Sequence, residues 1–297
     1  MSLSRVLITG GDGQLASDLD EQLSARAEVL APGRADLDIT DEGAVEAAFA
    51  SLQPDTVFNC AAFHNLDVCE REVDRSFEVN ARAVKRLGER CRDADAKLVH
   101  LSTNYVFDGR GDRPNREDDL PSPRSIYAIS KLAGEYAATA YAPGALVVRG
   151  AGLYGLHGSA SKGGNFVTRM LDRAREQPEL KMVADQRLQP TFTADLAAAL
   201  IAAVEADTSG LLHLTNGGEC SWHEFTVEIM RLAGVDIPIE AVQTTIPPGG
   251  VDRPLNGVLD RPAADAAGLE PLRHWRDALG DYMQRAGLLA SEVAQPS

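Results

Sequence analysis

The feature that most constrains the fold of this chain is a short strand-like run that passes directly into a cluster of glycines. Residues 5–9 are rich in aliphatic and β-branched side chains, a Gly-Gly-Asp-Gly turn follows at residues 10–13, and residues 14–23 have helical spacing. This order predicts a strand, a tight turn and a helix. A glycine turn in this context lets the backbone approach a pyrophosphate at the positive end of the helix. We therefore expect a dinucleotide site here, formed by Gly10, Gly13, Gln14 and Leu15.

The same unit recurs along the first half of the chain. Further strand patterns lie at residues 28–30, 56–60, 97–102 and 145–149, and helical patterns lie at residues 41–52, 74–94, 127–141 and 165–176. Strands that alternate with helices in this way predict a parallel sheet with helices on both faces. The expected fold class is therefore α/β, a Rossmann-type doubly wound parallel sheet.

The pattern changes after about residue 150. A glycine-rich stretch at residues 150–164 and a proline-rich stretch at residues 246–250 suggest loops around a ligand rather than new sheet repeats. We expect residues 1–150 to form the Rossmann domain, and residues 151–297 to form mainly a smaller, discontinuous substrate-binding domain. Residues 185–206 are expected to return to the Rossmann domain, because residues 195–206 have an alanine-rich helical pattern. Helical patterns at residues 222–233 and 274–287 predict satellite helices.

Charge and hydropathy exclude several classes of protein. The chain has 29 Lys and Arg against 44 Asp and Glu, a net charge of −15, which disfavours a nucleic-acid binder with a basic face. No run approaches the roughly 20 apolar residues that span a bilayer, so no membrane association is expected. The first residues pass straight into a strand pattern without the features of a signal peptide, and this predicts a cytoplasmic location.

The cysteine pattern points to reduced structural thiols. Cys60, Cys69, Cys91 and Cys220 are scattered without a CxxC pair, so neither a zinc site nor a disulfide framework is predicted. No other cluster has the spacing of metal ligands, so no metal-binding residues are predicted, and metal dependence stays open. The sequence leaves the oligomeric state open, a homodimer included.

The end of the second predicted strand bears on the choice of cofactor. An acidic residue there would bind the ribose 2′-hydroxyl of NAD, but the sequence is Ala-Pro-Gly-Arg at residues 31–34. Arg34 offers a guanidinium to a 2′-phosphate, so NADP(H) is favoured, although NAD(H) and a merely solvated arginine remain open. Asp38 and Ile39 lie slightly later and are expected beside the adenine.

A second constellation joins a tyrosine and a lysine. Tyr127 and Lys131 are four residues apart, which places them on the same face of a predicted helix. A tyrosine with an ordinary pKa near ~10 is a poor proton carrier at neutral pH, and a nearby cation lowers that pKa. Thr103 ends the strand upstream, where its hydroxyl can bind the oxygen of a substrate carbonyl.

With these residues in this order and spacing, the chain resembles the extended short-chain dehydrogenase/reductase family. The resemblance includes the glycine turn, Ala61 and Ala62 at the cofactor, and the Thr103, Tyr127 and Lys131 set. Residues 102–109, Ser-Thr-Asn-Tyr-Val-Phe-Asp-Gly, are close to the STDYVFDG signature of one group of nucleotide-sugar reductases in this family. Further matches extend the resemblance from about residue 4 to about residue 285, and they lie at residues 163–167, 184–186, 190–191, 221–225, 253–256 and 259–260.

The resemblance implies NAD(P)H-dependent reduction of a 4-keto nucleotide sugar, with dTDP-4-dehydrorhamnose as the expected substrate and dTDP-rhamnose as the product. Tyr127 would donate the proton, Lys131 would lower the Tyr127 pKa and hold the nicotinamide ribose, and Thr103 would bind the carbonyl oxygen. The residues expected at the nucleotide sugar are Asn104, Tyr105, Asn165, Phe166, Arg253 and Asn256.

Three departures from the family pattern concern the substrate. His64 stands where a threonine is usual, Asn104 replaces an aspartate, and Gly152 replaces a tryptophan expected near the sugar, which would enlarge or reshape the pocket. Two other classes stay open. An epimerase or dehydratase shares the Thr-Tyr-Lys set, but a dehydratase has acidic residues right after the threonine. A non-catalytic NADP-binding regulatory subunit, like that of methionine adenosyltransferase, shares the scaffold.

Overall fold

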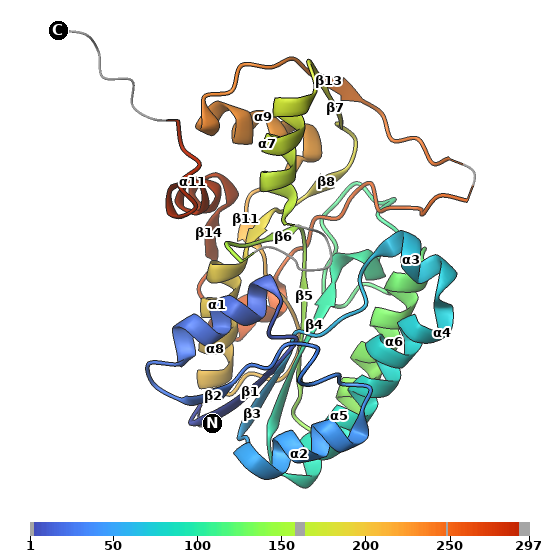
Figure 1. Ribbon diagram of the computed structural model, residues 1–297. Coiled ribbons are helices and arrows are strands. Elements are labelled where there is room, and N and C mark those ends of the chain that lie inside the picture. The colour runs from blue at the N-terminus through green and yellow to red at the C-terminus, as the bar shows by residue number, and fades with distance from the viewer. Residues whose placement is uncertain (1–2, 158–163, 248, 291–297) are drawn as a thin grey trace, which may run out of the picture.

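The computed structural model describes residues 3–157, 164–247 and 249–290, and its centre is a six-stranded parallel sheet (Figure 1). The strand order is β10-β5-β4-β3-β1-β2, and all five pairings are parallel. The bounds of the strands are β1 Arg5–Thr9, β2 Glu28–Leu30, β3 Thr56–Asn59, β4 Lys97–Thr103, β5 Leu146–Gly150 and β10 Gly210–His213. The predicted α/β class with a Rossmann-like parallel sheet is confirmed.

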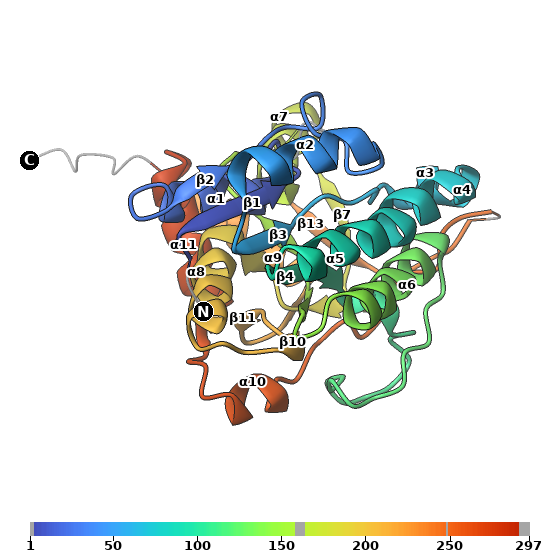
Figure 2. The ribbon, with the colours of Figure 1, turned by 90° about the horizontal axis from the view of Figure 1, so that it is seen from below.

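Helices cover both faces of this sheet, as Figures 1 and 2 show. On one face, α1 (Gln14–Leu23) and α8 (Thr193–Glu205) pack against each other and against β1, β4 and β5. On the other face lie α2 (Glu42–Leu52), α5 (Ala83–Asp93) and α6 (Ile126–Tyr141). The central strands β1, β3, β4 and β5 are buried on both sides and are nearly continuous apolar runs, which is why they could be recognised from the sequence.

The helix predicted at residues 74–94 is not one regular helix. After α3 (Leu66–Arg71) and α4 (Val73–Phe77), the chain makes a π-helical turn at Glu78–Arg82 before α5 begins. Within that turn, Asn80 is buried, its side-chain oxygen accepts the N–H of Phe63 at 2.8 Å, and its amide donates to the Phe63 carbonyl at 2.9 Å. The π turn therefore brings this part of the helix into contact with the loop that follows β3.

The second half of the chain returns to the main sheet. Helix α8 packs on α1, and β10 continues from it to lie beside β5, with Leu211 opposite Val147. Strand β10 was not predicted from the sequence. The Gly-Leu-Leu-His sequence of β10 has only four residues and none that is β-branched, so the strand preference of the sequence is weak, and its place depends on pairing with β5.

A second core lies beyond the ends of the main strands, in the upper part of Figure 1. It is formed by α7 (Phe166–Glu176), α9 (Trp222–Ala233) and α11 (Trp275–Arg285), with β7 (Leu180–Val183) paired in parallel to β13 (Ile239–Val242). The remaining short elements are β6 Leu153–Tyr154, β8 Arg187–Leu188, β9 Thr191–Phe192, β11 Asn216–Gly217, β12 Cys220–Ser221, α10 Pro262–Ala266 and β14 Leu272–His274. The small sheet of β7 and β13 was not expected from the sequence, because its two strands are more than 50 residues apart in the chain.

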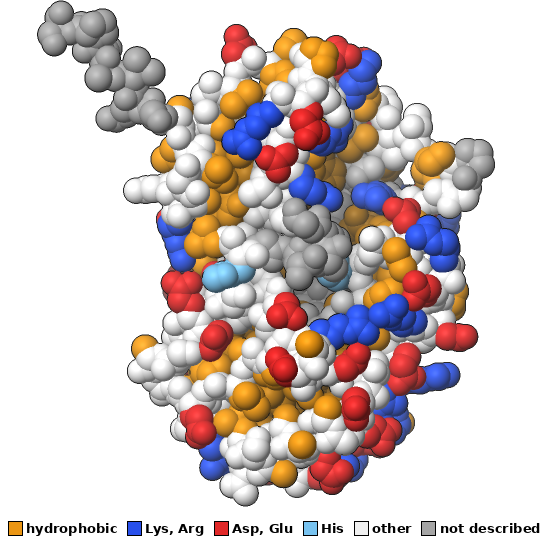
Figure 3. Space-filling view, in the orientation of Figure 1, with side chains coloured by type: hydrophobic (Ala, Val, Ile, Leu, Met, Phe, Trp, Pro, Cys, Tyr) orange, Lys and Arg blue, Asp and Glu red, His pale blue; other side chains and the backbone are white. Residues whose placement is uncertain are grey.

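The surface mixes both signs of charge. On the face in Figure 3, acidic and basic side chains are interspersed, and the basic ones do not gather in a single broad surface. Across the described ranges, no helix is both long enough and apolar enough to span a membrane. The same ranges contain no group of three His, Cys, Asp or Glu side chains placed to hold a metal ion.

Candidate functional site

The glycine turn packs directly on the end of β3. Gly10 has a φ of +74°, and a Cβ at this position would lie 2.9 Å from the backbone of Ala61. Only glycine fits both the conformation and the close approach. The Gly13 N–H donates to the Gly10 carbonyl at 2.8 Å, and no side chain caps the N-terminus of α1. The turn therefore presents the first turn of a helix at the carboxyl edge of the sheet, an arrangement that fits a pyrophosphate.

Two predicted cofactor residues near this turn have structural contacts. The Gln14 side-chain oxygen accepts the N–H of Gly155 at 2.7 Å, which ties the start of α1 to the segment after β6. Leu15 is 6% exposed and lies in the core between α1 and the sheet. The Leu15 side chain therefore does not face the turn, and only its backbone is left for a ligand there.

At the end of β2, Arg34 and Asp38 form an ion pair. The Nε and Nη2 atoms of Arg34 both lie 3.1 Å from Asp38 Oδ2. Burial by itself would raise the pKa of Asp38, but hydrogen bonds from Thr40 and Arg34 hold that pKa below its ordinary value. Ile39 is 4% exposed and is part of the protein interior rather than an open contact surface. Asp38 thus orients Arg34 beside the sheet edge.

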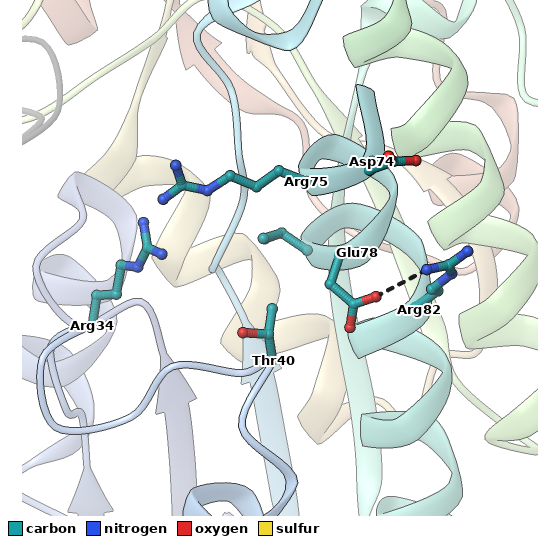
Figure 4. A pocket seen from close by; sticks show the side chains of 7 residues that line it. Arg34, Thr40, Asp74, Arg75, Glu78 and Arg82 are labelled. Carbon is teal, nitrogen blue, oxygen red and sulfur yellow. Dashed lines mark hydrogen bonds and ion pairs between the residues drawn. The ribbon is translucent and has the colours of Figure 1, made fainter. Parts of the chain in front are cut away.

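A pocket of about 360 Å³ opens beside Arg34. Figure 4 shows its lining side chains, with Arg34 and Thr40 on one side and Arg75, Glu78 and Arg82 on the other. The second set comes from α4 and the π turn, and the sequence analysis did not identify it. The recurrence of arginine at residues 71, 75 and 82 was a signal in the sequence, but nothing local indicated that Arg75 faces Arg34.

The predicted catalytic side chains lie together where β4 ends and α6 begins. Thr103 is the last residue of β4, and Ser125 caps α6 by accepting the Ala128 N–H at 3.2 Å, which sets Tyr127 in the first turn of the helix. The rings of Tyr127 and Tyr105 meet edge to face with centroids 5.9 Å apart. The Tyr127 hydroxyl is hydrogen bonded to the Thr103 side chain. Two hydroxyls and a second phenol therefore converge on one point of the sheet edge.

The pKa of Tyr127 differs from the sequence-based expectation. Burial raises this pKa above its ordinary value, and the hydrogen bond with Thr103 is the main effect that opposes the rise. The expected lowering by the Lys131 cation is therefore wrong for this structure. The phenol is consequently neutral at physiological pH, which is the form that can donate a proton.

Lys131 is buried beneath this cluster, with 2% of its surface exposed. Its Nζ donates to the Leu101 carbonyl at 2.5 Å and lies 3.5 Å from His100 Nε2. Burial lowers the pKa of Lys131 to about 8, although Glu135 and Cys60 act in the opposite direction. The lysine is therefore held by β4 and titrates close to the physiological range.

A buried polar chain leads from Lys131 across three strands. His100 Nδ1 lies 3.0 Å from Asn59 Nδ2, and Thr9 Oγ1 donates to Asn59 Oδ1 at 2.7 Å. Burial and the neighbouring Lys131 hold the pKa of His100 well below its ordinary value, so the imidazole is neutral. These hydrogen-bonded side chains could not be predicted from the sequence, because they belong to β1, β3 and β4 and become neighbours only in the sheet.

Arg253 lies at the catalytic cluster. Burial raises the pKa of Tyr105, while Arg253, which is hydrogen bonded to the Tyr105 side chain, acts to lower it. Arg253 itself is exposed. A guanidinium from the second half of the chain therefore stands next to Tyr105, within the same group of side chains as Tyr127.

Two other predicted substrate residues hold loops together. Asn104 is 5% exposed, and its amide donates to the Gly257 carbonyl at 2.9 Å. The Asn256 amide donates to the carbonyls of Gly111 and Arg113, each at 2.8 Å. Both asparagines thus join the segment after β4 to the segment around residue 256, and both amide hydrogens of Asn256 are used in doing so.

Asn165 and Phe166 begin α7. The Asn165 amide donates to the Gly155 carbonyl at 2.8 Å and to the Tyr282 hydroxyl at 2.7 Å, and its oxygen caps the helix at Thr168. No amide hydrogen of Asn165 is left for a nucleotide, which corrects the sequence-based expectation. Phe166 packs against Trp222 with ring centroids 4.3 Å apart, so its ring belongs mainly to an aromatic cluster.

The departures from the family pattern have local explanations. Gly152 has a φ of +57°, and a Cβ there would lie 2.8 Å from Leu188 Cδ1. Leu188 therefore lies directly beside Gly152 and occupies the space next to it. His64 lies with Nδ1 3.3 Å from the Ala62 carbonyl, close to the loop that packs on the glycine turn.

Known proteins resemble this chain over nearly its whole length. A family model described as the RmlD substrate binding domain matches residues 4–287. A dTDP-4-dehydrorhamnose reductase of Streptomyces griseus is 43% identical over 285 residues, which are 93% of this chain and 91% of that protein. The crystal structure of a dTDP-4-dehydrorhamnose reductase of Clostridium acetobutylicum has a TM-score of 0.90 at 36% identity, covering 95% of this chain and 99% of that one. A structure of such a reductase from Bacillus anthracis in complex with NADP has a TM-score of 0.89 at 29% identity, covering 96% of this chain and 99% of that one.

Proposed function

Since this chain belongs to the family of the RmlD substrate binding domain, we propose that it is an NAD(P)H-dependent oxidoreductase that reduces a 4-keto nucleotide sugar. Its cofactor is NADP(H), and its expected reaction converts dTDP-4-dehydrorhamnose to dTDP-rhamnose, in line with its relatives that are named dTDP-4-dehydrorhamnose reductase. The single observation that carries the proposal is the convergence of Thr103, Tyr127 and Lys131 at the sheet edge beside the glycine turn.

The glycine turn and the pocket beside Arg34 fit a dinucleotide. Gly10 leaves no room for a Cβ against Ala61, the start of α1 is uncapped, and a pocket follows at the end of β2. Gly10, Gly13 and the first turn of α1 would hold the pyrophosphate, and the pocket would hold the adenosine end. When bound, the cofactor supplies a hydride to the sugar carbonyl carbon.

The side chains of the protein supply the proton and hold the substrate in place. The neutral phenol of Tyr127 donates its proton to the oxygen that becomes an alkoxide, and the Thr103 hydroxyl binds that oxygen. Lys131, held between Leu101 and His100, lies one helical turn after Tyr127 on α6 and would hold the nicotinamide ribose. Arg253 beside Tyr105 binds the diphosphate of the nucleotide sugar, since a guanidinium suits phosphate oxygens.

The structure also bears on the competing functions. A non-catalytic binding subunit has no use for a buried lysine next to a tyrosine and threonine pair, so the presence of Thr103, Tyr127 and Lys131 in this chain supports an enzyme. A dehydratase uses an acidic residue after the threonine, whereas Asn104 is committed to the Gly257 carbonyl. An epimerase shares the three groups, so the products of the reaction must separate it from a reductase.

The direct test is oxidation of NADPH and of NADH by the purified protein with dTDP-4-dehydrorhamnose, generated in situ from dTDP-glucose. We expect stoichiometric oxidation of NADPH with formation of the reduced sugar, identified by mass and by proton NMR. Tyr127→Phe serves as the control. Tight cofactor binding without oxidation would contradict the reductase proposal, and conversion of a sugar to its epimer without net oxidation would favour an epimerase.

A further inference from the structure

We infer that Arg75, on α4, forms with Arg34 a two-sided clamp for the ribose 2′-phosphate of NADPH, and that Arg75 is a second determinant of cofactor choice. This inference rests on the proposed function. It assigns a role to a helix that follows β3, in addition to the loop that follows β2. The two guanidinium groups reach the pocket from opposite sides and point toward one another in Figure 4.

Arg34 is held in place from two directions. Its backbone N–H donates to Asp12 in the glycine turn at 2.9 Å, and its side chain forms the ion pair with Asp38. The side chain is nevertheless 60% exposed. Asp38 thus binds one edge of the guanidinium, and the rest of the group remains open to the pocket.

Arg75 is held independently. Its guanidinium carbon lies 4.8 Å from the centre of the Phe63 ring, and Nη1 donates to Glu72 Oε2 at 3.0 Å. Phe63 follows directly after Ala61 and Ala62 in the loop that packs on the glycine turn. Stacking on this ring restricts the arginine to one direction, which lowers the entropy lost when it binds a phosphate. Its side chain is 44% exposed and remains accessible.

The acidic residues that line the pocket, Asp74 and Glu78, do not pair with Arg34 or Arg75. Each of these two arginines has one carboxylate partner outside the lining, Asp38 for Arg34 and Glu72 for Arg75. Glu78 accepts hydrogen bonds from Arg86 at 2.5 Å and from Arg82 at 3.4 Å, and these arginines hold its pKa low. Asp74 and Arg82 point away from the space between Arg34 and Arg75 in Figure 4. In a chain with a net charge of −15, two converging guanidinium groups form a local site for an anion.

The position of the pocket identifies the anion. In a doubly wound fold, the adenosine ribose lies at the end of the second strand when the pyrophosphate lies on the glycine turn. A 2′-phosphate on that ribose carries the charge that suits two arginines, whereas NADH has a neutral hydroxyl there. Arg75 should therefore contribute to the binding of NADPH and not to the binding of NADH.

The test measures the dissociation constants of NADPH and NADH for the full-length protein by isothermal titration calorimetry. We expect the wild-type protein to prefer NADPH, and Arg75→Ala to weaken NADPH binding about tenfold with NADH binding unchanged, as for the loss of one charge-assisted hydrogen bond. Arg75→Gln, which keeps a flat polar group without the charge, should show the same loss. Arg175→Ala is the matched control and should change neither constant, since Arg175 on α7 is an exposed arginine that pairs with Asp172 three residues before it, as Arg75 pairs with Glu72, but does not line the pocket.

Three outcomes overturn the clamp. If the Arg75 variants weaken the binding of NADPH and of NADH equally, Arg75 contacts a part of the molecule that both cofactors share. Unchanged NADPH binding in both Arg75 variants, or a wild-type protein without preference for NADPH, would also exclude it. Each of these results leaves the reductase proposal standing if NADPH oxidation with the 4-keto sugar is observed. Failure of that oxidation, with the preference for NADPH and the Arg75 effect intact, would instead overturn the proposed function alone.

Discussion

The ammonium of Lys131 donates a 2.5 Å hydrogen bond to the carbonyl of Leu101, which joins the first turns of α6 to the carboxyl end of β4. Tyr127 lies one helical turn before Lys131, and Thr103 lies two residues after Leu101. This one contact therefore fixes the register between the element that carries the phenol and the strand that carries the threonine.

Replacing Tyr127 by phenylalanine removes the proposed proton donor and little else. The ring can keep its edge-to-face contact with Tyr105. We expect kcat to fall by about 10²- to 10⁴-fold, the usual contribution of a general acid, and the dissociation constant of NADPH to change little. Stopped-flow oxidation of NADPH and calorimetric titration measure the two quantities. Retention of most of the activity would show that another group supplies the proton.

Lys131 should make the stability of the protein depend on pH in the alkaline range. Its pKa is lowered from an ordinary value of 10.5 to about 8 by burial, so between these values the unfolded chain binds one more proton than the native state. The free energy of unfolding therefore rises with pH between about 8 and about 10.5, by about 3 kcal/mol for this group. Lys131→Met should lose this rise. Urea unfolding of both proteins at several pH values measures the difference, and parallel curves would contradict the buried titration.

His213 should make the stability of the protein depend on pH in the acidic range. Burial lowers its pKa from 6.5 to about 4, and the neighbouring Arg149 contributes in the same direction. The imidazole is neutral in the native state, with Nδ1 2.8 Å from the Asp260 carbonyl and Nε2 3.4 Å from Arg149 Nη1. Between pH 6.5 and 4 the unfolded chain binds the extra proton, so stability falls by about 3 kcal/mol as the pH is lowered.

The matching variant is His213→Gln, which keeps a polar side chain at the site but does not titrate. Its free energy of unfolding should fall less steeply than that of the wild-type protein between pH 6.5 and 4. The low pKa of His100 contributes the same loss in both proteins and cancels in the comparison. Identical pH dependence of the two proteins would mean that the pKa of His213 is the same in the native and unfolded states.

Arg253 should act on substrate binding more than on turnover. It is exposed and stands beside Tyr105, so its removal leaves no buried charge unpaired. We expect Arg253→Ala to raise the KM for the nucleotide sugar about tenfold or more, as for a lost charge-assisted hydrogen bond, with a smaller change in kcat. Arg110→Ala is a suitable control, because Arg110 is an exposed arginine that pairs with the adjacent Asp252. Equal KM values for both variants would exclude the proposed diphosphate contact.

Gly152 should not tolerate a side chain. Its φ of +57° is unfavourable for other residues, and a Cβ would overlap Leu188 Cδ1. We expect Gly152→Ala to lower the free energy of unfolding by about 1–3 kcal/mol. In contrast, a Cβ at Gly280 in α11 would meet no atom within 4 Å, so Gly280→Ala should be neutral or stabilising by up to about 1 kcal/mol. Chemical denaturation of the two variants tests the pair, and equal effects would contradict the packing around Gly152.

The amino-acid sequence by itself determined the elements whose patterns are local. The strand of residues 5–9, the glycine turn and helix 14–23 follow from periodicity and from the conformational freedom of glycine. The four-residue spacing of Tyr127 and Lys131 placed both on α6, and the strand that ends at Thr103 was equally clear. These features depend on residues close together in the chain, so no tertiary contact was needed to predict them.

Tertiary structure decided everything that depends on distant segments. Strand β10 forms because β5 pairs with it. The polar chain from Thr9 to Lys131 forms because three strands are neighbours in the sheet. The amide of Asn165 is occupied because it donates a hydrogen bond to the Tyr282 hydroxyl. Arg75 faces Arg34 only because the π turn and the loop after β3 bring α4 to the end of β2. Each of these contacts joins residues that are far apart in sequence, and a periodic pattern along the chain holds no information about such pairs.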